Sequence, residues 1–207
     1  MATSVVEDQS VLPAADRRGA RRHATVLLVG QVRRGSDTAV CLVHDISPDG
    51  VMARFTQVPV IGETVEIAVR GLSPATATVR WVSGYKAGLA FDEQQDLGGV
   101  LGRASGKVSR APRFNVALAT ELMAGSSRLV VELVDLSPGG AKLIVDDALQ
   151  PGTPVQLALP GSVAPVPATV CWYRDARTGL RFTYPLEMAT LARIIALDDG
   201  RDLPPQL

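Results

Sequence analysis

Short runs of alternating apolar and polar residues, separated by Gly and Pro, recur along most of the chain. In TVEIAV, residues 64–69, the alternation places Val65, Ile67 and Val69 on one face of an extended strand. The other runs are equally short and rich in Val, Thr and aromatic residues, which favour strands. The pattern predicts strands at residues 25–32, 38–47, 51–56, 64–72, 76–84, 86–91, 115–122, 128–137, 141–147, 154–160, 168–175 and 178–184.

One segment has helical rather than alternating spacing. Residues 186–197, LEMATLARIIAL, place Leu191, Ile194 and Ile195 on one side of a helix. Each group of six short strands fits a small closed antiparallel barrel, because closure leaves no unpaired strand edge. We therefore expect a mainly all-β fold of two six-stranded antiparallel barrels in tandem, with a C-terminal helix that covers one end of the second barrel.

The two halves of the chain repeat each other. DISPDG returns as DLSPGG, ATVRW as ATVCW, and AGLAF as TGLRF. Asp45 and Asp135 lie 90 residues apart, and Trp81 and Trp172 lie 91 residues apart. A nearly constant spacing over several landmarks indicates a duplicated unit.

The repeat divides the chain into four parts. We expect a mobile N-terminal tail at residues 1–16, a first domain at 17–93 and a second domain at 109–200 that includes the helix. The Gly- and Ser-rich stretch between them, residues 94–108, is the predicted linker.

Composition limits the kinds of partner. The 207 residues carry no net charge, which argues against wholesale binding of DNA or another nucleic acid. The charge is nevertheless uneven, because residues 17–34 hold six arginines and no acid, a pattern that favours a small anionic ligand. No apolar run is long enough for a membrane helix, so no membrane insertion is expected. Cys41 and Cys171 have no metal-ligand spacing, so we expect reduced thiols in a cytoplasmic protein without a metal.

Two short segments of the first unit carry the chemistry of recognition. RGARR holds Arg18 and Arg22, whose planar guanidinium groups match phosphate oxygens and the O6/N7 edge of guanine. DISPDG holds Asp45, a double acceptor that suits the N1–H and 2-amino edge of guanine, and Ser47, which can both donate and accept. Gly50 allows the backbone to turn closely past a bound molecule. Alone, this corner could equally be a structural turn in which Asp and Ser bond nearby main-chain groups.

Arg-x-x-x-Arg followed by Asp-x-Ser-x-x-Gly within a small β-barrel resembles the PilZ domain family. The resemblance covers residues 17–92 and, in weaker form, residues 109–184. It implies binding of the bacterial second messenger cyclic di-GMP, with no other cofactor. Arg18 and Arg22 would then hold phosphate and guanine, and Asp45, Ser47 and Gly50 would form the rest of the site. An arginine directly before the motif, here Arg17, is the position that in this family contacts a second ligand molecule.

The second unit departs from that pattern. It keeps Asp135, Ser137 and Gly140, but Ser109 stands where the family motif has its first arginine. Arg110 and Arg113 remain as weaker candidates for ligand binding in the second unit. We therefore expect the second barrel to have lost or weakened ligand binding and to serve in docking or dimerisation.

Two function classes follow from these observations. The first is a receptor that binds cyclic di-GMP in the first barrel and signals through an unidentified protein partner. The alternative is a ligand-independent adaptor that acts by protein–protein contact alone. An enzyme is not expected, because no paired carboxylates, catalytic triad or metal cluster is found in the sequence. The sequence leaves open whether the protein forms a homodimer.

Overall fold

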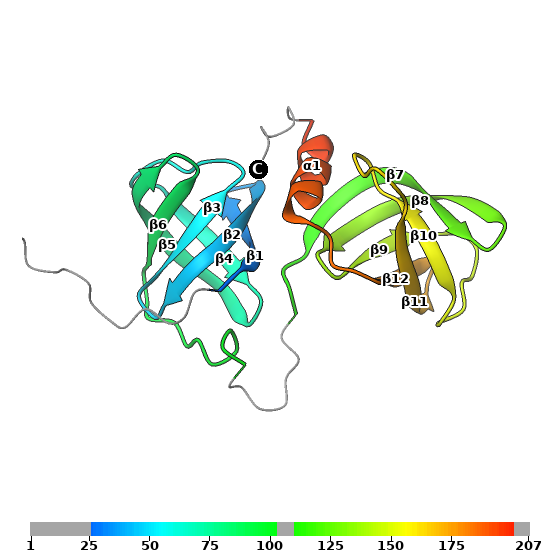
Figure 1. Cartoon of the computed structure of the whole chain (residues 1–207), viewed down its shortest axis with the longest axis horizontal. Coiled ribbons are helices and arrows are strands. Elements are labelled where there is room, and N and C mark those ends of the chain that lie inside the picture. Colours follow the sequence, from blue (N-terminus) through cyan, green and yellow to red (C-terminus); the bar gives the residue numbers. More distant parts are fainter. Residues whose placement is uncertain (1–25, 103–109, 201–207) are drawn as a thin grey trace, which may run out of the picture.

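The computed structural model of the chain describes residues 26–102 and 110–200 and has two six-stranded barrels in tandem (Figure 1). Within these residues, all the regular structure is antiparallel strand apart from one C-terminal helix, α1 (Met188–Asp198), which confirms the expected fold class. The first barrel consists of β1 (Leu28–Arg34), β2 (Asp37–Ser47), β3 (Gly50–Phe55), β4 (Thr64–Val69), β5 (Leu72–Ser83) and β6 (Lys86–Phe91). The second consists of β7 (Phe114–Ala124), β8 (Ser127–Ser137), β9 (Gly140–Ile144), β10 (Pro154–Ala158), β11 (Val166–Arg174) and β12 (Arg177–Phe182).

Both barrels close in the same order. In the first, β1 pairs with β2 and β4, and the ring continues through β3, β6 and β5. The second repeats this order through β7, β8, β9, β12, β11 and β10. The duplication read from the sequence is therefore a duplication of the whole barrel.

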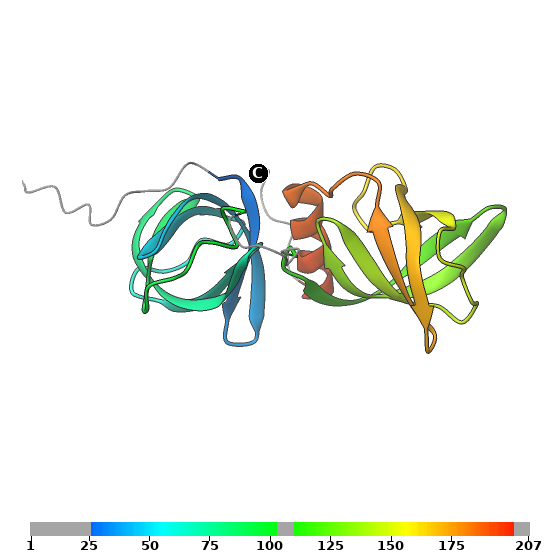
Figure 2. The ribbon, with the colours of Figure 1, turned by 90° about the horizontal axis from the view of Figure 1, so that it is seen from below.

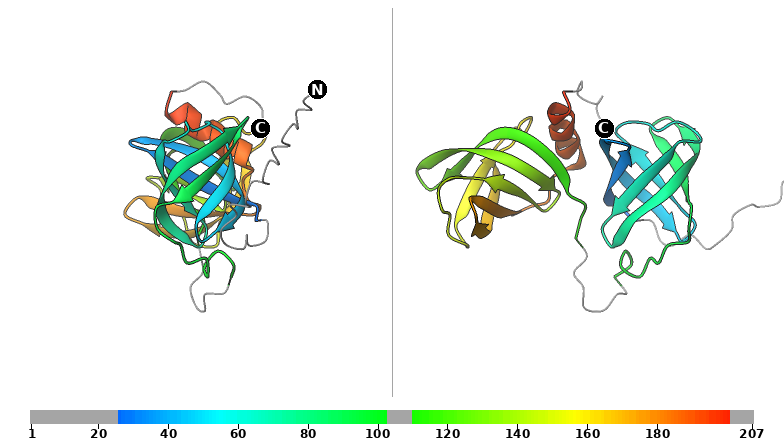
Figure 3. Two further views of the ribbon diagram at one scale, coloured as in Figure 1. Left: turned by 90° about the vertical axis from the view of Figure 1, so that its left-hand side faces the viewer. Right: turned by 180° about the vertical axis from the view of Figure 1, so that it is seen from behind.

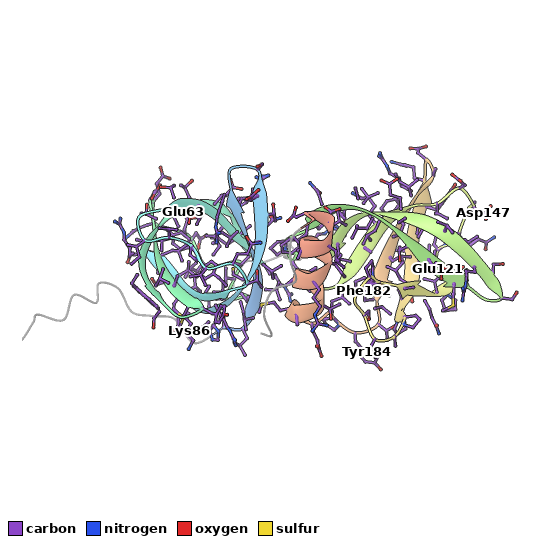
Figure 4. All side chains as sticks on the ribbon, turned by 90° about the horizontal axis from the view of Figure 1, so that it is seen from above. Glu63, Lys86, Glu121, Asp147, Phe182 and Tyr184 are labelled. Carbon is purple, nitrogen blue, oxygen red and sulfur yellow. The ribbon has the colours of Figure 1, made fainter. Side chains whose placement is uncertain are left out.

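Alternate residues of each strand fill the barrel interior. In β3, Val51, Ala53 and Phe55 are buried while the residues between them are partly exposed, as the period of two requires. The interior of each barrel is one hydrophobic cluster, with Phe55 fully buried in the first and Phe114 fully buried in the second. Polar and charged side chains project from the outer surfaces, as the labelled Lys86 and Glu121 show (Figure 4).

Helix α1 lies between the two barrels (Figures 1 and 2), and the rear view of Figure 3 shows the same arrangement. It contacts β7 of its own barrel and β2 of the first barrel. Val40 on β2 is only 1% exposed because it joins the hydrophobic cluster that contains Leu191 and Ile194 of α1. Gln31 on β1 also donates a side-chain hydrogen bond of 3.0 Å to the main-chain oxygen of Arg113. The helix therefore covers the second barrel as expected, and it also joins the two barrels.

Part of the segment expected as a linker packs on the first barrel. Leu97 is 4% exposed and belongs to the hydrophobic cluster of that barrel, with Val100 and Leu101 packed against it. Gly99 lies against Gly71, where an added Cβ would come within 2.3 Å of the Gly71 oxygen. The expected tail at residues 1–16 lies outside the described residues.

The two cysteines have different surroundings. Cys41 is buried on β2, and burial raises the pKa of its thiol to about 12, so it stays protonated at neutral pH. Cys171 is exposed on β11, and both thiols are free. Among the described residues no group of three or more His, Cys, Asp and Glu side chains could hold a metal ion. No helix in the same part of the chain has the length and apolar character needed to cross a membrane.

Candidate ligand-binding site

The DISPDG corner joins β2 to β3 and is held by its own residues. The Ser47 hydroxyl donates a hydrogen bond of 3.3 Å to the Gly50 main-chain oxygen. A Cβ at Gly50 would stand 2.4 Å from the Leu89 main-chain oxygen, so no side chain fits between β3 and β6 at this point. Ser47 and Gly50 thus have a structural role in the corner, whatever is bound beside it.

A β-bulge turns Asp45 to the outside of the barrel. Val43 points into the core, and strict alternation would point Asp45 inward as well. The register of β2 against β3 shifts between these two residues, so that Asp45 lies opposite the partly exposed Met52 and Ile46 takes the inward position. Bulges of this kind re-aim side chains and are frequent beside binding sites.

Asp45 belongs to a row of residues that crosses four strands on the outer wall. Asp45 lies opposite Met52, Met52 opposite Gly88, and Gly88 opposite Trp81. Residues directly opposite each other share a face of the sheet, so this row forms one surface about 14 Å wide over three strand spacings. A second bulge, between Val79 and Trp81, turns the indole outward.

Trp81 is 41% exposed and lies over Gly88. A Cβ at Gly88 would stand 2.0 Å from the indole Nε1, so only glycine leaves room for the ring there. The structure places the indoles of Trp81 and its counterpart Trp172 on the outer wall, where part of each ring can be reached by a ligand.

The second barrel repeats the row with one decisive change. Asp135 lies opposite Lys142, Lys142 opposite Gly179, and Gly179 opposite Trp172. Lys142 therefore takes the position that the uncharged Met52 holds in the first barrel. Its Nζ lies 2.6 Å from Asp135 Oδ2, and the Asp135 side chain is only 5% exposed.

Arg113 is the second cation that bonds the Asp135 carboxylate. Its guanidinium Nη1 pairs with Asp135 Oδ1, while Ser137 donates to the Gly140 oxygen at 3.1 Å, as in the first corner. Arg110, the other arginine expected here, is exposed at the start of the second described range. The Asp135 carboxylate is thus already bonded to two cations of its own barrel.

The predicted arginines of the first site, Arg17, Arg18 and Arg22, lie outside the described residues. Val26, the first described residue, lies beside the corner, because its main-chain N–H donates a hydrogen bond of 2.8 Å to the His44 oxygen. His44 directly precedes Asp45. The structure therefore brings together Asp45, Ser47 and Gly50 of the expected site.

Met52 and Lys142 belong to these rows but were not among the expected site residues, and Trp81 lies in the same row as Met52. Their positions follow from strand register, and the register depends on bulges that alternation does not reveal. One comparison within the repeat could have pointed to Met52 and Lys142 from the sequence alone. Aligning the two halves sets Lys142 against Met52, which is a change of charge inside an otherwise similar strand.

Comparison with known proteins adds to this picture. The sequence profile described as "PilZ domain" matches residues 16–100 and again residues 107–197. No curated protein matches the chain.

Three similar solved structures illustrate the range of likeness. The PlzA protein of Borreliella burgdorferi in complex with c-di-GMP is 13% identical over 83% of this chain and 91% of that chain, with a TM-score of 0.38. The PilZ domain of CeSA from a cellulose-synthesizing bacterium is 24% identical over 44% and 97% of the two chains, with a TM-score of 0.33. YcgR from Escherichia coli in complex with c-di-GMP is 15% identical over 75% and 76%, with a TM-score of 0.29.

Proposed function

The chain belongs to the PilZ domain family, and on this premise we propose that it is a cyclic di-GMP receptor whose ligand site lies on the first barrel. Arg18 and Arg22 hold phosphate and guanine, and Arg17 contacts a second ligand molecule. Asp45 accepts hydrogen bonds from the guanine N1–H and 2-amino group. Ser47 and Gly50 shape the corner beside it.

The observation that carries this proposal is the ion pair between Arg113 and Asp135 in the second barrel. Arg113 stands 91 residues after Arg22, and Asp135 stands 90 residues after Asp45. The duplicated barrel thus supplies a template in which an arginine at this position reaches the acid of the corner. The main-chain bond from Val26 to His44 is consistent with a similar approach in the first barrel.

The outer wall of the first barrel offers a surface suited to a purine dinucleotide. Asp45 stands at one end of the row and the partly exposed Trp81 at the other, with only Met52 and Gly88 between them. A carboxylate recognises the donor edge of guanine, and an indole can stack on a base. The residue directly opposite Asp45 on β3, Met52, is uncharged, whereas the second barrel has Lys142 there.

Titration calorimetry of cyclic di-GMP into the wild-type protein and Asp45→Ala tests the proposal. We expect Asp45→Ala to weaken binding by about tenfold to a hundredfold, because a hydrogen bond to a charged group is worth about 1.5–3 kcal/mol. GTP serves as the ligand control. The matched protein control is Asp49→Ala, which removes an acid from the same corner at a position where the second barrel has Gly139.

An Asp45→Ala protein that keeps full affinity, together with an unchanged thermal unfolding midpoint, contradicts the proposal. Equal weakening by Asp49→Ala contradicts it as well, because the Asp49 carboxylate accepts a hydrogen bond from Gln94 at the exposed edge of the corner. A wild-type protein that binds no cyclic di-GMP favours the adaptor function over the receptor function.

Met52→Lys should place beside Asp45 the same cation that Lys142 places beside Asp135. A lysine here lies opposite Asp45 as Lys142 lies opposite Asp135, so we expect it to pair with the carboxylate. Affinity for cyclic di-GMP should fall by about tenfold, with the fold unchanged because the same residue stands in the second barrel. Met52→Leu is the matched control, and a lysine variant that binds as tightly as the leucine variant shows that β3 does not shape the site.

The second barrel is proposed to act by protein contact rather than as a second copy of the first site. Lys142 bonds the Asp135 carboxylate in addition to Arg113, whereas the first barrel has Met52 at this position, so a guanine would have to displace a further cation in the second barrel. Output from the receptor passes to a protein partner, because both barrels act by binding.

A further inference from the structure

The second barrel has a pocket on its outer wall that the proposed receptor function does not use. The cavity measures about 470 Å³, within the range of about 300–1,000 Å³ that holds small ligands. Its lining residues come from β9 and from the hairpin of β11 and β12, strands that Figure 1 labels. Its lining consists of Lys142, Trp172, Tyr173, Arg174, Asp175 and Arg177.

The charges of this pocket are not needed by the barrel fold. The first barrel has the same strands and hairpin, with Ser83 and Lys86 paired across the turn where the second barrel pairs Arg174 with Arg177. It also has Met52 in place of Lys142. Side chains required by the fold should recur in both copies, yet the lining has three cations, whereas the equivalent positions of the first barrel have one, Lys86.

Two of these cations are available to a ligand. Lys142 is engaged with Asp135, but Arg174 and Arg177 are exposed, and within the described ranges neither guanidinium pairs with a carboxylate. A planar guanidinium presents donors that match phosphate oxygens. The turn between the two arginines brings Asp175 to the pocket in a left-handed conformation with a φ of 50°, where the first barrel has Gly84.

Trp172 supplies a surface for a flat ring. Its indole lies over Gly179, where a Cβ would come within 2.1 Å of Nε1, and 40% of the residue is exposed. Exposed aromatic rings beside cations are typical of sites that stack a base and hold its phosphate. Asp175 adds an acceptor for the N–H edge of such a base.

From this combination we propose that the β9, β11 and β12 wall of the second barrel binds a mononucleotide, with its phosphate on Arg174 and Arg177 and its base on Trp172. This site lies beside the Asp135 corner and does not require the arginine motif. It extends the function of the second barrel from protein contact to recognition of a second small molecule.

Fluorescence of Trp172 isolates this site. The chain has two tryptophans, so Trp81→Phe leaves Trp172 as the only indole signal. We expect GMP to quench that signal to saturation, and guanosine or inorganic phosphate alone to bind at least about tenfold more weakly, because each supplies half of the contacts. The measurement does not depend on cyclic di-GMP, so its failure is distinct from failure of the receptor function.

In the same background, Arg174→Ser/Arg177→Ser should weaken GMP binding by about a hundredfold, or about tenfold for each guanidinium. The single variant Arg174→Ser restores the residue of the first barrel and keeps the test valid if the double variant unfolds. The control is Arg181→Ala, which removes an exposed arginine about 13 Å along the same strand, where the first barrel has Ala90. The proposal is overturned by absence of saturable quenching up to millimolar GMP, by unchanged affinity in Arg174→Ser, or by phosphate that binds as tightly as GMP.

Discussion

An Arg18→Ala/Arg22→Ala double variant is expected to lose cyclic di-GMP affinity by about a hundredfold to ten-thousandfold. Each guanidinium makes charge-assisted contacts worth about 1.5–3 kcal/mol, and two such losses add when the contacts are independent. The loss should therefore exceed that of Asp45→Ala. Titration calorimetry on the full chain measures it, and the thermal midpoint of unfolding of both proteins serves as the control for the fold.

The control for this experiment removes the same charge from other places. Arg33 pairs with Glu66 at 2.9 Å and Arg128 pairs with Glu121 at 3.5 Å, both at exposed positions. Such surface pairs contribute little to stability, so Arg33→Ala/Arg128→Ala should fold and bind normally. If the two double variants lose the same affinity, net charge rather than a specific arginine site governs binding, and the receptor proposal fails in its present form.

Alternation and the repeat were sufficient to predict the barrels. The strand at residues 86–91 has the predicted bounds, and most of the other strands differ from theirs by only a few residues. The largest difference is in β5, which begins at Leu72 rather than residue 76. A tight turn explains it, since Gly71 adopts a φ of 86° and allows Val69 to pair directly with Leu72. The sequence shows the glycine, but it does not show that Val69 and Leu72 pair across it to form a hairpin.

The candidate site was harder to predict because it is built on exceptions to alternation. Asp45 and Trp81 each follow an inward residue by two positions, so a strict period of two points both into the core. Bulges after Val43 and Val79 reverse that direction, and the second barrel repeats them before Asp135 and Trp172. A bulge depends on pairing between two strands, which a single strand pattern does not contain. Motif resemblance found the acid and the serine, whereas the surface across Met52 to Trp81 needed the register.

The contact between the barrels is the other feature that the sequence did not reveal. Val40 reads as an ordinary strand residue, yet its outward side chain is buried against the cluster around α1. Gln31, which lies opposite Val40, bonds the main chain of Arg113. Arg113 in turn bonds the acid of the second corner. One wall of the first barrel is therefore in direct contact with Arg113 of the second barrel.

Val40→Asp should separate the barrels without unfolding either of them. The side chain points out of the first barrel, so its core is untouched, but a carboxylate in the α1 cluster would be buried without a partner at a cost of several kcal/mol. Separation of the barrels returns the charge to water and avoids that cost. Small-angle X-ray scattering should show a larger radius of gyration, while far-UV circular dichroism keeps the β signal.

Thr38→Asp gives the comparison that isolates the interface. Thr38 lies two residues before Val40 on the same face of β2, is partly exposed and is outside the buried cluster, so the same new charge remains in contact with water. Its scattering profile should match the wild type. An unchanged profile in Val40→Asp means that the cluster contributes little to holding the barrels together. If the first barrel binds cyclic di-GMP without its neighbour, the separated protein should still bind it, and loss of binding there would show that the second barrel supports the proposed site.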